Sequence, residues 1–224
     1  MNSIRLNELS TFIESNDKLA DVGCDHGYLS ILAIKKGVTF LQLIDNKAEP
    51  LKNSIKNLRS YEVYNDKQIS INYTLSSGLT DLLPEIDTVA LAGMGGKLII
   101  KILNDSFEKI KKLKKIIIQA NTDLYSLRDY LDSNKLKITN EKILYDSGKY
   151  YEIIVATYDE NHSQTALSED EKFFGPLLLV ERSQTFLEKW NEQLMKLELI
   201  KNKQKNSECA VEEKINYIRN TLKF

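Results

Sequence analysis

Short apolar runs and apolar stripes at helical spacing alternate along the first 160 positions. Short runs are typical of buried strands, and apolar residues three and four apart are typical of amphipathic helices. The runs predict strands over residues 19–22, 39–44, 69–74, 87–91 and 115–120. The stripes predict helices over residues 3–15, 27–36, 47–59 and 97–103, and one more that ends at Asn134. Strands that alternate with helices predict parallel strands in a doubly wound α/β sheet.

Two further strands, residues 137–146 and 150–158, follow this alternating part of the chain. They are predicted to form an antiparallel hairpin through Ser147-Gly148-Lys149. Five strands of βα type and this hairpin make a seven-stranded Rossmann-like sheet. A sheet that ends in such a hairpin is more typical of methyltransferases than of dehydrogenases.

The pattern changes beyond residue 160. Residues 159–168 are polar, and they predict a boundary between two domains, 1–160 and 165–224. Two apolar stripes follow: Leu187, Trp190, Leu194 and Leu197, then Val211, Ile215, Ile218 and Leu222. These stripes predict two helices folded back on each other as an antiparallel coiled-coil hairpin.

The turn after the first strand reads D-V-G-C-D-H-G-Y and carries the first candidate site. Gly23 permits a positive φ or a close approach of backbone to ligand. Asp21, Asp25 and His26 place titratable groups at the carboxyl end of a parallel strand, where such sheets bind ligands. The turn is neither G-x-G-x-x-G nor a Walker A loop, so dinucleotide and phosphate-binding sites lose support. The alternative is an ordinary βα turn with a capping carboxylate.

Three later positions extend this candidate site along the same edge of the sheet. Asp45 ends the second strand and is placed to accept hydrogen bonds from ribose hydroxyls, or else to cap the next helix. The glycine-rich segment A-G-M-G-G, residues 92–96, follows the fourth strand and brings backbone N–H groups to a ligand. Asn121 follows the fifth strand, and it or Thr122 is expected to cap the helix beyond. Arg5 in the first helix is expected to be solvated, and the alternative is that it reaches toward the ligand.

Composition limits the possible partners. The 224 residues have a formal net charge of −1, so contacts to nucleic acid must come from local patches. One such patch is expected on the C-terminal hairpin, and the alternative is a solvated lysine face. Its members are Lys189, Lys196, Lys201, Lys203 and Lys205. Two cysteines, no signal-peptide pattern and no apolar run of membrane-spanning length lead us to expect a cytoplasmic protein without membrane contact.

Five segments, in this order, resemble the bacterial tRNA adenine-N1-methyltransferases that modify adenine 22. They are A-D-V-G-C-D-H-G-Y-L, A-G-M-G-G, I-I-Q-A-N, Y-E-I-I-V-A and F-G-P-L-L-L. The resemblance covers nearly the whole chain. It implies that the N-terminal domain binds S-adenosylmethionine, that the C-terminal coiled coil helps to hold tRNA, and that no metal is needed.

The resemblance also implies which residues bind the cofactor. The expected set is Asp21, Gly23, Cys24, Asp45, Asn46, Ser77, Gly78, Gly93, Met94 and Gly95. Two positions depart from the family pattern. Ser77 stands where the family usually has an aspartate suited to the adenine amino group of the cofactor, and Ala120 replaces a proline.

The chemistry of the implied reaction suggests roles for four residues. Adenine N1 has its own lone pair, and its methylation leaves a cationic ring, so a nearby carboxylate would stabilise the developing charge. We expect Asp25 to supply it, His26 to bind the base or orient Asp25, and Tyr28 to stack on the base. Asn121 is expected to bind the edge of the base. The alternatives are a non-catalytic module for nucleosides or RNA, and a methyltransferase for another substrate.

Overall fold

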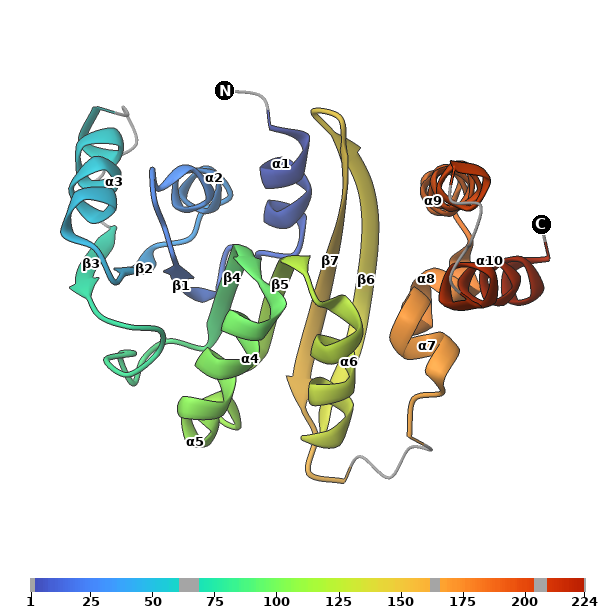
Figure 1. Ribbon diagram of the computed structural model, residues 1–224. Helices are drawn as coiled ribbons and strands as arrows, with labels where there is room; N and C mark the ends of the chain where they lie inside the picture. Colours follow the sequence, from blue (N-terminus) through green and yellow to red (C-terminus); the bar gives the residue numbers. More distant parts are fainter. Residues whose placement is uncertain (1–2, 61–68, 162–165, 204–208, 224) are drawn as a thin grey trace.

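The protein is built around a seven-stranded sheet with the strand order β3-β2-β1-β4-β5-β7-β6 (Figure 1). The computed structural model describes residues 3–60, 69–161, 166–203 and 209–223. The strands are β1 (Lys18–Val22), β2 (Phe40–Asp45), β3 (Ser70–Leu75), β4 (Thr88–Gly95), β5 (Lys115–Thr122), β6 (Leu136–Asp146) and β7 (Lys149–Tyr158). β1 to β5 pair in parallel, and β7 is antiparallel to both β5 and β6. The predicted Rossmann-like sheet is confirmed.

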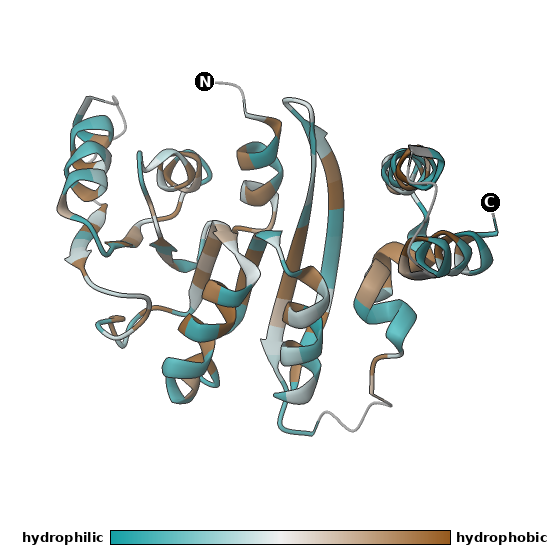
Figure 2. Cartoon of the chain, in the orientation of Figure 1, coloured by the Kyte–Doolittle hydropathy of each residue, from teal (hydrophilic) through white to brown (hydrophobic). Residues whose placement is uncertain are grey.

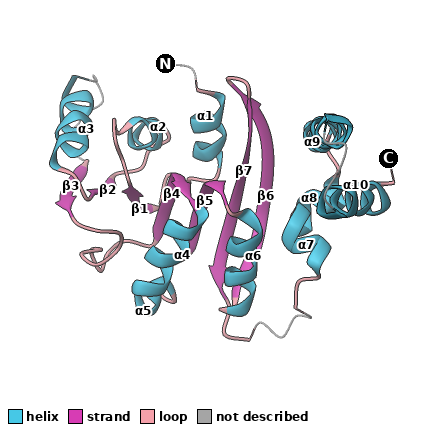
Figure 3. Ribbon diagram, in the orientation of Figure 1, coloured by secondary structure: helices cyan, strands magenta, loops and turns pink. Residues whose placement is uncertain are grey.

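Helices cover both faces of this sheet (Figure 3). They are α1 (Ile4–Thr11), α2 (Tyr28–Lys35), α3 (Ala48–Ser60), α4 (Gly96–Asp105), α5 (Phe107–Ile110), α6 (Leu124–Ser133), α7 (Glu169–Phe174), α8 (Pro176–Glu181), α9 (Gln184–Lys203) and α10 (Cys209–Leu222). The pattern did not predict α5, α7 and α8. Each of these helices has six residues or fewer, too few for an apolar stripe to repeat.

Two apolar cores lie on the two faces of the sheet. Helices α1, α2 and α3 pack on one face, and α4, α5 and α6 on the other. The apolar faces of these helices turn inward to the sheet (Figure 2). β1 and β2 are buried along nearly all of their length, and β4 is buried from Thr88 to Leu91, which explains why these stretches read as continuous apolar runs.

Two local features of the sheet follow from glycine. Ser147 and Gly148 close the β6–β7 hairpin, both with positive φ, which is the backbone shape of a two-residue hairpin turn. β4 was expected to end at Leu91, but it continues to Gly95, with shifts in its register against β5 after Ala92. The glycine-rich segment is therefore an irregular strand end, and the turn is confined to the start of α4.

The C-terminal helices form a third apolar cluster against β6. α9 and α10 pack against each other, and ion pairs Lys201–Glu212 and Arg219–Glu198 join them in the order expected for antiparallel helices. Phe174, Phe186 and Trp190 fill the cluster, which also contains Ile143 of β6. The two predicted helices are confirmed, whereas their supercoiling stays a prediction. Residues 162–165, within the predicted linker, lie outside the described residues.

A buried ion network ties these helices to the sheet. Arg128 of α6 is fully buried, and its Nε donates to Glu141 of β6 at 2.8 Å. Its Nη2 donates to Glu152 of β7 at 2.5 Å. Lys189 of α9 pairs with the same Glu152, and Glu141 accepts hydrogen bonds from the N-terminal backbone of α8. One guanidinium therefore connects α6, the β6–β7 hairpin and the C-terminal helices.

Replacing Arg128 is expected to destabilise the whole fold. Arg128→Met would leave Glu141 and Glu152 buried without the guanidinium, which costs about 3–5 kcal/mol in comparable buried pairs. Unfolding in denaturant measures the loss. Lys196→Met, which breaks an exposed pair with Glu192, should cost about 1 kcal/mol or less. Equal losses in the two variants would contradict the role given to Arg128.

Candidate functional site

Two pockets lie side by side at the carboxyl edge of the parallel strands, where the strand order reverses between β1 and β4. Ligands of open α/β sheets bind at this switch point. We name them the Asp45 pocket and the Asp25 pocket. Both are lined by Gly23, so they meet at the turn after β1.

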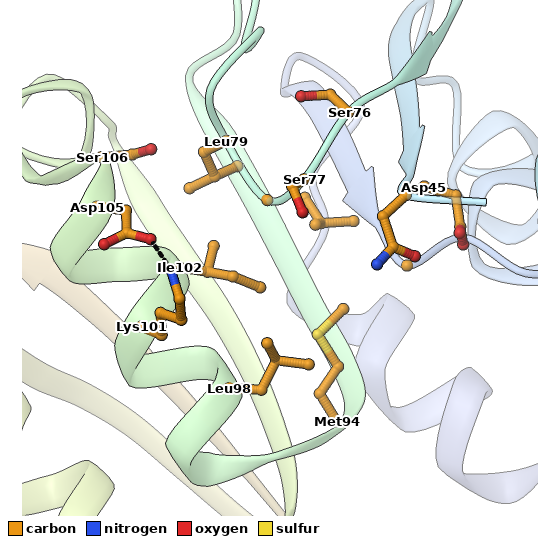
Figure 4. Close-up of a pocket in the computed structure, with 14 residues that line it drawn as sticks. Asp45, Ser76, Ser77, Leu79, Met94, Leu98, Lys101, Ile102, Asp105 and Ser106 are labelled. Atoms are coloured by element: carbon orange, nitrogen blue, oxygen red, sulfur yellow. Dashed lines mark hydrogen bonds and ion pairs between the residues drawn. The ribbon is translucent and has the colours of Figure 1, made fainter.

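The Asp45 pocket combines the carboxylate of Asp45 with apolar walls. Asp45 is buried at the end of β2, and its Oδ1 accepts the Lys47 N–H at 2.9 Å. This bond orients the carboxylate at the pocket wall, so local capping and a ligand role are compatible. Met94, Leu98, Ile102 and Leu79 provide the apolar surface, which suits a flat ring (Figure 4). A carboxylate beside an apolar slot fits a ribose joined to adenine.

The polar end of the Asp45 pocket contains both expected and unexpected residues. Ser77 and Gly78 line it, as the resemblance implies, and the exposed Ser77 offers a hydroxyl in place of the usual carboxylate. Lys101 and Asp105 of α4 form an ion pair at the same pocket. Their spacing of four residues is common on helix surfaces, so nothing in the pattern distinguished them.

The Asp25 pocket gathers the polar residues of the first turn. Asp25 has φ 43°, and its Oδ2 lies 3.5 Å from His26 Nε2. The ring of His26 lies 5.5 Å from that of Tyr28. All three residues line the pocket, which brings together three of the four expected catalytic side chains. The left-handed backbone at Asp25, rare outside glycine, turns its carboxylate outward, where it is 66% exposed.

Asp21 lies at the base of this pocket and is buried. Ser30 Oγ donates to its Oδ2 at 2.8 Å. Burial is the main reason why the pKa of Asp21 rises to about 6, and the nearby Asp45 carboxylate adds to the rise. A buried carboxylate with so little compensation favours a cationic ligand group such as an ammonium.

Cys24 is placed differently from its neighbours. The thiol is buried, 3.7 Å from Ser54 Oγ of α3, and burial raises its pKa to about 12. A thiol with a raised pKa is neither a nucleophile nor a metal ligand at neutral pH. Its side chain therefore packs the turn onto α3, and only its backbone is suited to face a ligand.

Met94 fills the gap between the turn after β1 and the end of β4. The end of its side chain lies against Gly23, whose φ of 71° favours glycine. Met94 lines the Asp45 pocket, and Gly93 beside it lines the Asp25 pocket. The segment 92–96 is thus the partition between the pockets.

A hydrogen-bond network behind the Asp25 pocket holds this partition. Gln119 of β5 is buried, and its Oε1 accepts Arg5 Nη1 at 2.6 Å and the Gly93 N–H at 3.2 Å. Its Nε2 donates to Asn121 Oδ1 at 3.0 Å, and Asn121 Nδ2 donates to the Gly93 carbonyl at 2.8 Å. Arg5, Gln119 and Asn121 together fix both polar groups of the Gly93 backbone.

This network corrects two expectations. Arg5 is half-buried and lines the Asp25 pocket, so the expectation of a solvated arginine is wrong. Neither Asn121 nor Thr122 caps α6, because the N-cap residue is Asp123 at φ 59°, without a side-chain cap. Asn121 lines neither pocket, whereas its amide binds Gly93. In the sequence, the one feature that distinguishes Gln119 is its place as a polar residue inside the apolar run I-I-I-Q-A.

Two absences concern only the described part of the chain. No group of three or more His, Cys, Asp or Glu side chains there is arranged to hold a metal ion. None of the helices there combines the length and apolar character that crossing a membrane requires.

Comparison with known proteins decides the family. The model of the TrmK family, tRNA (adenine(22)-N(1))-methyltransferase, matches residues 19–223. The chain belongs to this family. The tRNA (adenine(22)-N(1))-methyltransferase of Bacillus subtilis (strain 168) is 28% identical over 229 residues, which cover 93% of this chain and 92% of that protein.

Solved TrmK-like structures share the fold over the whole chain. Streptococcus pneumoniae Sp1610 in complex with S-adenosyl-L-methionine is 30% identical, with a TM-score of 0.85, over 99% of this chain and 100% of that one. M. capricolum TrmK in complex with S-adenosyl-homocysteine is 26% identical, with a TM-score of 0.84, over 100% and 98% of the two chains. S-adenosylmethionine is thus the cofactor of the TrmK family. The Asp45 pocket has a carboxylate and apolar walls that can accept its adenosine part.

The buried Asp21 predicts a pH-dependent stability difference. Its pKa of about 6 means that the folded state holds a proton on Asp21 up to about pH 6, whereas an aspartate in the unfolded chain loses it near pH 3.8. This group therefore favours folding below pH 4, and its contribution disappears as the pH rises through 6, a change of about 3 kcal/mol. Asp21→Asn cannot titrate, so the variant should gain stability relative to the parent at pH 8 and not at pH 4. Denaturant unfolding at both pH values measures this, and a pH-independent difference would contradict it.

Gln119 is predicted to matter for activity beyond its share of stability. Gln119→Met removes the acceptor shared by Arg5 and Gly93, which should cost about 1–3 kcal/mol and loosen the partition between the pockets. Methyl transfer to tRNA should then fall about tenfold or more. The matched control is Gln42→Met, since Gln42 is equally buried and bonds to Thr74, Asp81 and Leu83 away from both pockets. Equal kinetic effects in the two variants would reject the positioning role of Gln119.

Proposed function

We propose that this chain transfers a methyl group from S-adenosyl-L-methionine to N1 of adenine 22 in tRNA, using the Asp45 pocket for the cofactor and the Asp25 pocket for the base. The observation that carries the proposal is the meeting of the two pockets at Gly23. Groups held in adjoining pockets start close together, as an in-line displacement requires. Membership of the TrmK family supports the reaction and the tRNA substrate.

The Asp45 pocket would hold the adenosine part of the cofactor. When bound, S-adenosylmethionine supplies an electrophilic methyl group on a sulfonium. The carboxylate of Asp45, oriented by the Lys47 N–H, would accept hydrogen bonds from ribose hydroxyls. Met94 and Leu98 would cover the adenine, with Asn46, Ser77 and Gly78 along its polar edge. The methionine part would extend past Gly23, where its ammonium would pair with Asp21 at the base of the adjoining Asp25 pocket.

The Asp25 pocket would act on the base. The carboxylate of Asp25 would accept a hydrogen bond from the adenine amino group and stabilise the positive charge that develops on the ring. His26, 3.5 Å away, would orient this carboxylate, and Tyr28 would stack on the base. Asn121 would act through Gly93, as a positioning residue, because its amide is engaged there.

The division of labour between residues 1–160 and 165–224 is part of the same proposal. All residues that line the Asp45 pocket or the Asp25 pocket belong to residues 1–160, and residues 165–224 would dock the tRNA. Part of the positive charge of residues 165–224 is already neutralised, since Lys189, Lys196 and Lys201 each pair with a carboxylate. Lys205 and the side chain of Lys203 lie outside the described residues. Since tRNA is a cytoplasmic molecule, we place the reaction in the cytoplasm.

Methyl transfer from labelled S-adenosylmethionine tests the proposal, with total tRNA, protein and small molecules as acceptors. Label should enter only tRNA, at N1 of adenine 22. Asp25→Asn should lower turnover at least tenfold with the fold intact, because asparagine tolerates the left-handed backbone of this position. Calorimetry with the cofactor is the control. A collapse of cofactor affinity in this variant would move Asp25 from the base to the cofactor.

A further inference from the structure

A pair of tyrosines, the exposed Tyr145 and the half-buried Tyr150, stands at the tip of the β6–β7 hairpin. Tyr145 and Tyr150 are direct partners across the two strands, and their ring centroids lie 4.8 Å apart at 55°. Tyr145 is 48% exposed. A cross-strand aromatic pair stabilises a hairpin by itself. Position and charge indicate a second role for this one.

The hairpin tip adjoins the Asp25 pocket. Ala120 of β5 pairs with Glu152 of β7, so the preceding residues Tyr151 and Tyr150 reach the carboxyl edge of the sheet. The guanidinium of Arg5, which lines the pocket, lies over the ring of Tyr151 at 5.5 Å. Asp146 at the tip accepts the backbone N–H of Arg5 at 3.0 Å, which anchors the turn to α1.

The other face of the tip is turned toward the C-terminal helices. Tyr150 donates its hydroxyl to Glu192 of α9 at 2.7 Å, so the tyrosine pair lies on the side of α9. In Figure 1 the tip stands between α1 and α9. The tip therefore contacts both α1, whose Arg5 lines the Asp25 pocket, and α9.

Charge at the tip also suits an RNA. Arg5 and Lys149 form no ion pair with any residue that the structure describes, in contrast to Lys189, Lys196 and Lys201 of α9. Three acidic side chains near the tip are already engaged: Asp146, Glu192 and Glu188, whose Oε1 accepts Gln184 Nε2 at 2.9 Å. Asp146 bonds to α1 and Ser147, and Glu192 bonds to Tyr150 and Lys196. Lys149 is the neighbour of Tyr150 in β7, and a cation next to an aromatic ring is typical of sites that bind unpaired nucleotides.

We propose that the Tyr145–Tyr150 pair is a stacking platform for an unpaired base of the tRNA, adjacent to the nucleotide held in the Asp25 pocket. Proteins read single-stranded RNA loops largely by stacking splayed bases on aromatic rings. Arg5 and Lys149 contact the flanking phosphates. This inference rests on the proposed function for the identity of the RNA, while its test does not require methyl transfer.

Substitutions at Tyr145 test the platform by affinity. Tyr145→Leu keeps an apolar strand residue without the ring and should weaken tRNA binding about tenfold or more. Its cofactor affinity should stay unchanged, its melting temperature should fall only slightly with the loss of the cross-strand pair, and Tyr145→Phe should restore tRNA binding. The matched control is Tyr158→Leu, at the opposite end of β7, where the ring packs against Phe107 at 6.0 Å. Normal tRNA affinity in Tyr145→Leu, or no rescue by phenylalanine, would overturn the proposal.

Fluorescence of Tyr145→Trp reports stacking directly. The one native tryptophan, Trp190, is buried in the C-terminal cluster and gives a constant background. Addition of tRNA without cofactor should quench the new indole, whereas fully paired RNA should not. Quenching without methylation in the transfer assay would preserve the platform and reject the proposed function. Binding of tRNA without quenching, or equal quenching by paired RNA, would reject the platform.

Discussion

The close approach of two glycine segments is the constraint on which the site depends. The turn after β1 and the end of β4 meet where the side chain of Met94 lies against Gly23, whose φ of 71° favours glycine. This contact separates the space at the sheet edge into two pockets that still meet. The hydrogen-bond network of Arg5, Gln119 and Asn121 then binds the N–H and the carbonyl of Gly93, so the backbone of the partition is held in place.

A second constraint joins the site to the C-terminal helices. Glu141 and Glu152 lie in the hairpin that carries the Tyr145–Tyr150 pair, and both share the Arg128 guanidinium. Glu152 also binds Lys189 of α9, while the residue beside it, Tyr151, contacts Arg5. The hairpin is therefore a common support for the Asp25 pocket on one side and for α9 on the other. Cutting the chain after β7 would leave two buried carboxylates short of partners, so side-chain substitution is the better way to separate the two parts.

Periodicity was sufficient for most of the fold, because buried parallel strands and amphipathic helices each leave a repeating pattern. It also placed Asp45, Asp25 and His26 at the carboxyl edge, since that edge follows from strand direction alone. The misses have a common cause. Arg5 and Gln119 lie 114 positions apart, and the left-handed Asp123 that starts α6 is a local backbone choice. Contacts between distant segments and single unusual dihedral angles leave no periodic signal.

The raised pKa of Asp21 has a consequence for ligand binding. At pH values just below 6 the free protein holds a proton on this buried carboxyl, and a cationic group placed beside it must displace that proton. Binding would then release a proton to the solvent, and the observed heat would vary with the ionisation enthalpy of the buffer. Affinity would strengthen as the pH rises toward 7 and level off beyond it. The unfavourable burial of one carboxylate in the free protein thus becomes a source of selectivity for a positively charged ligand.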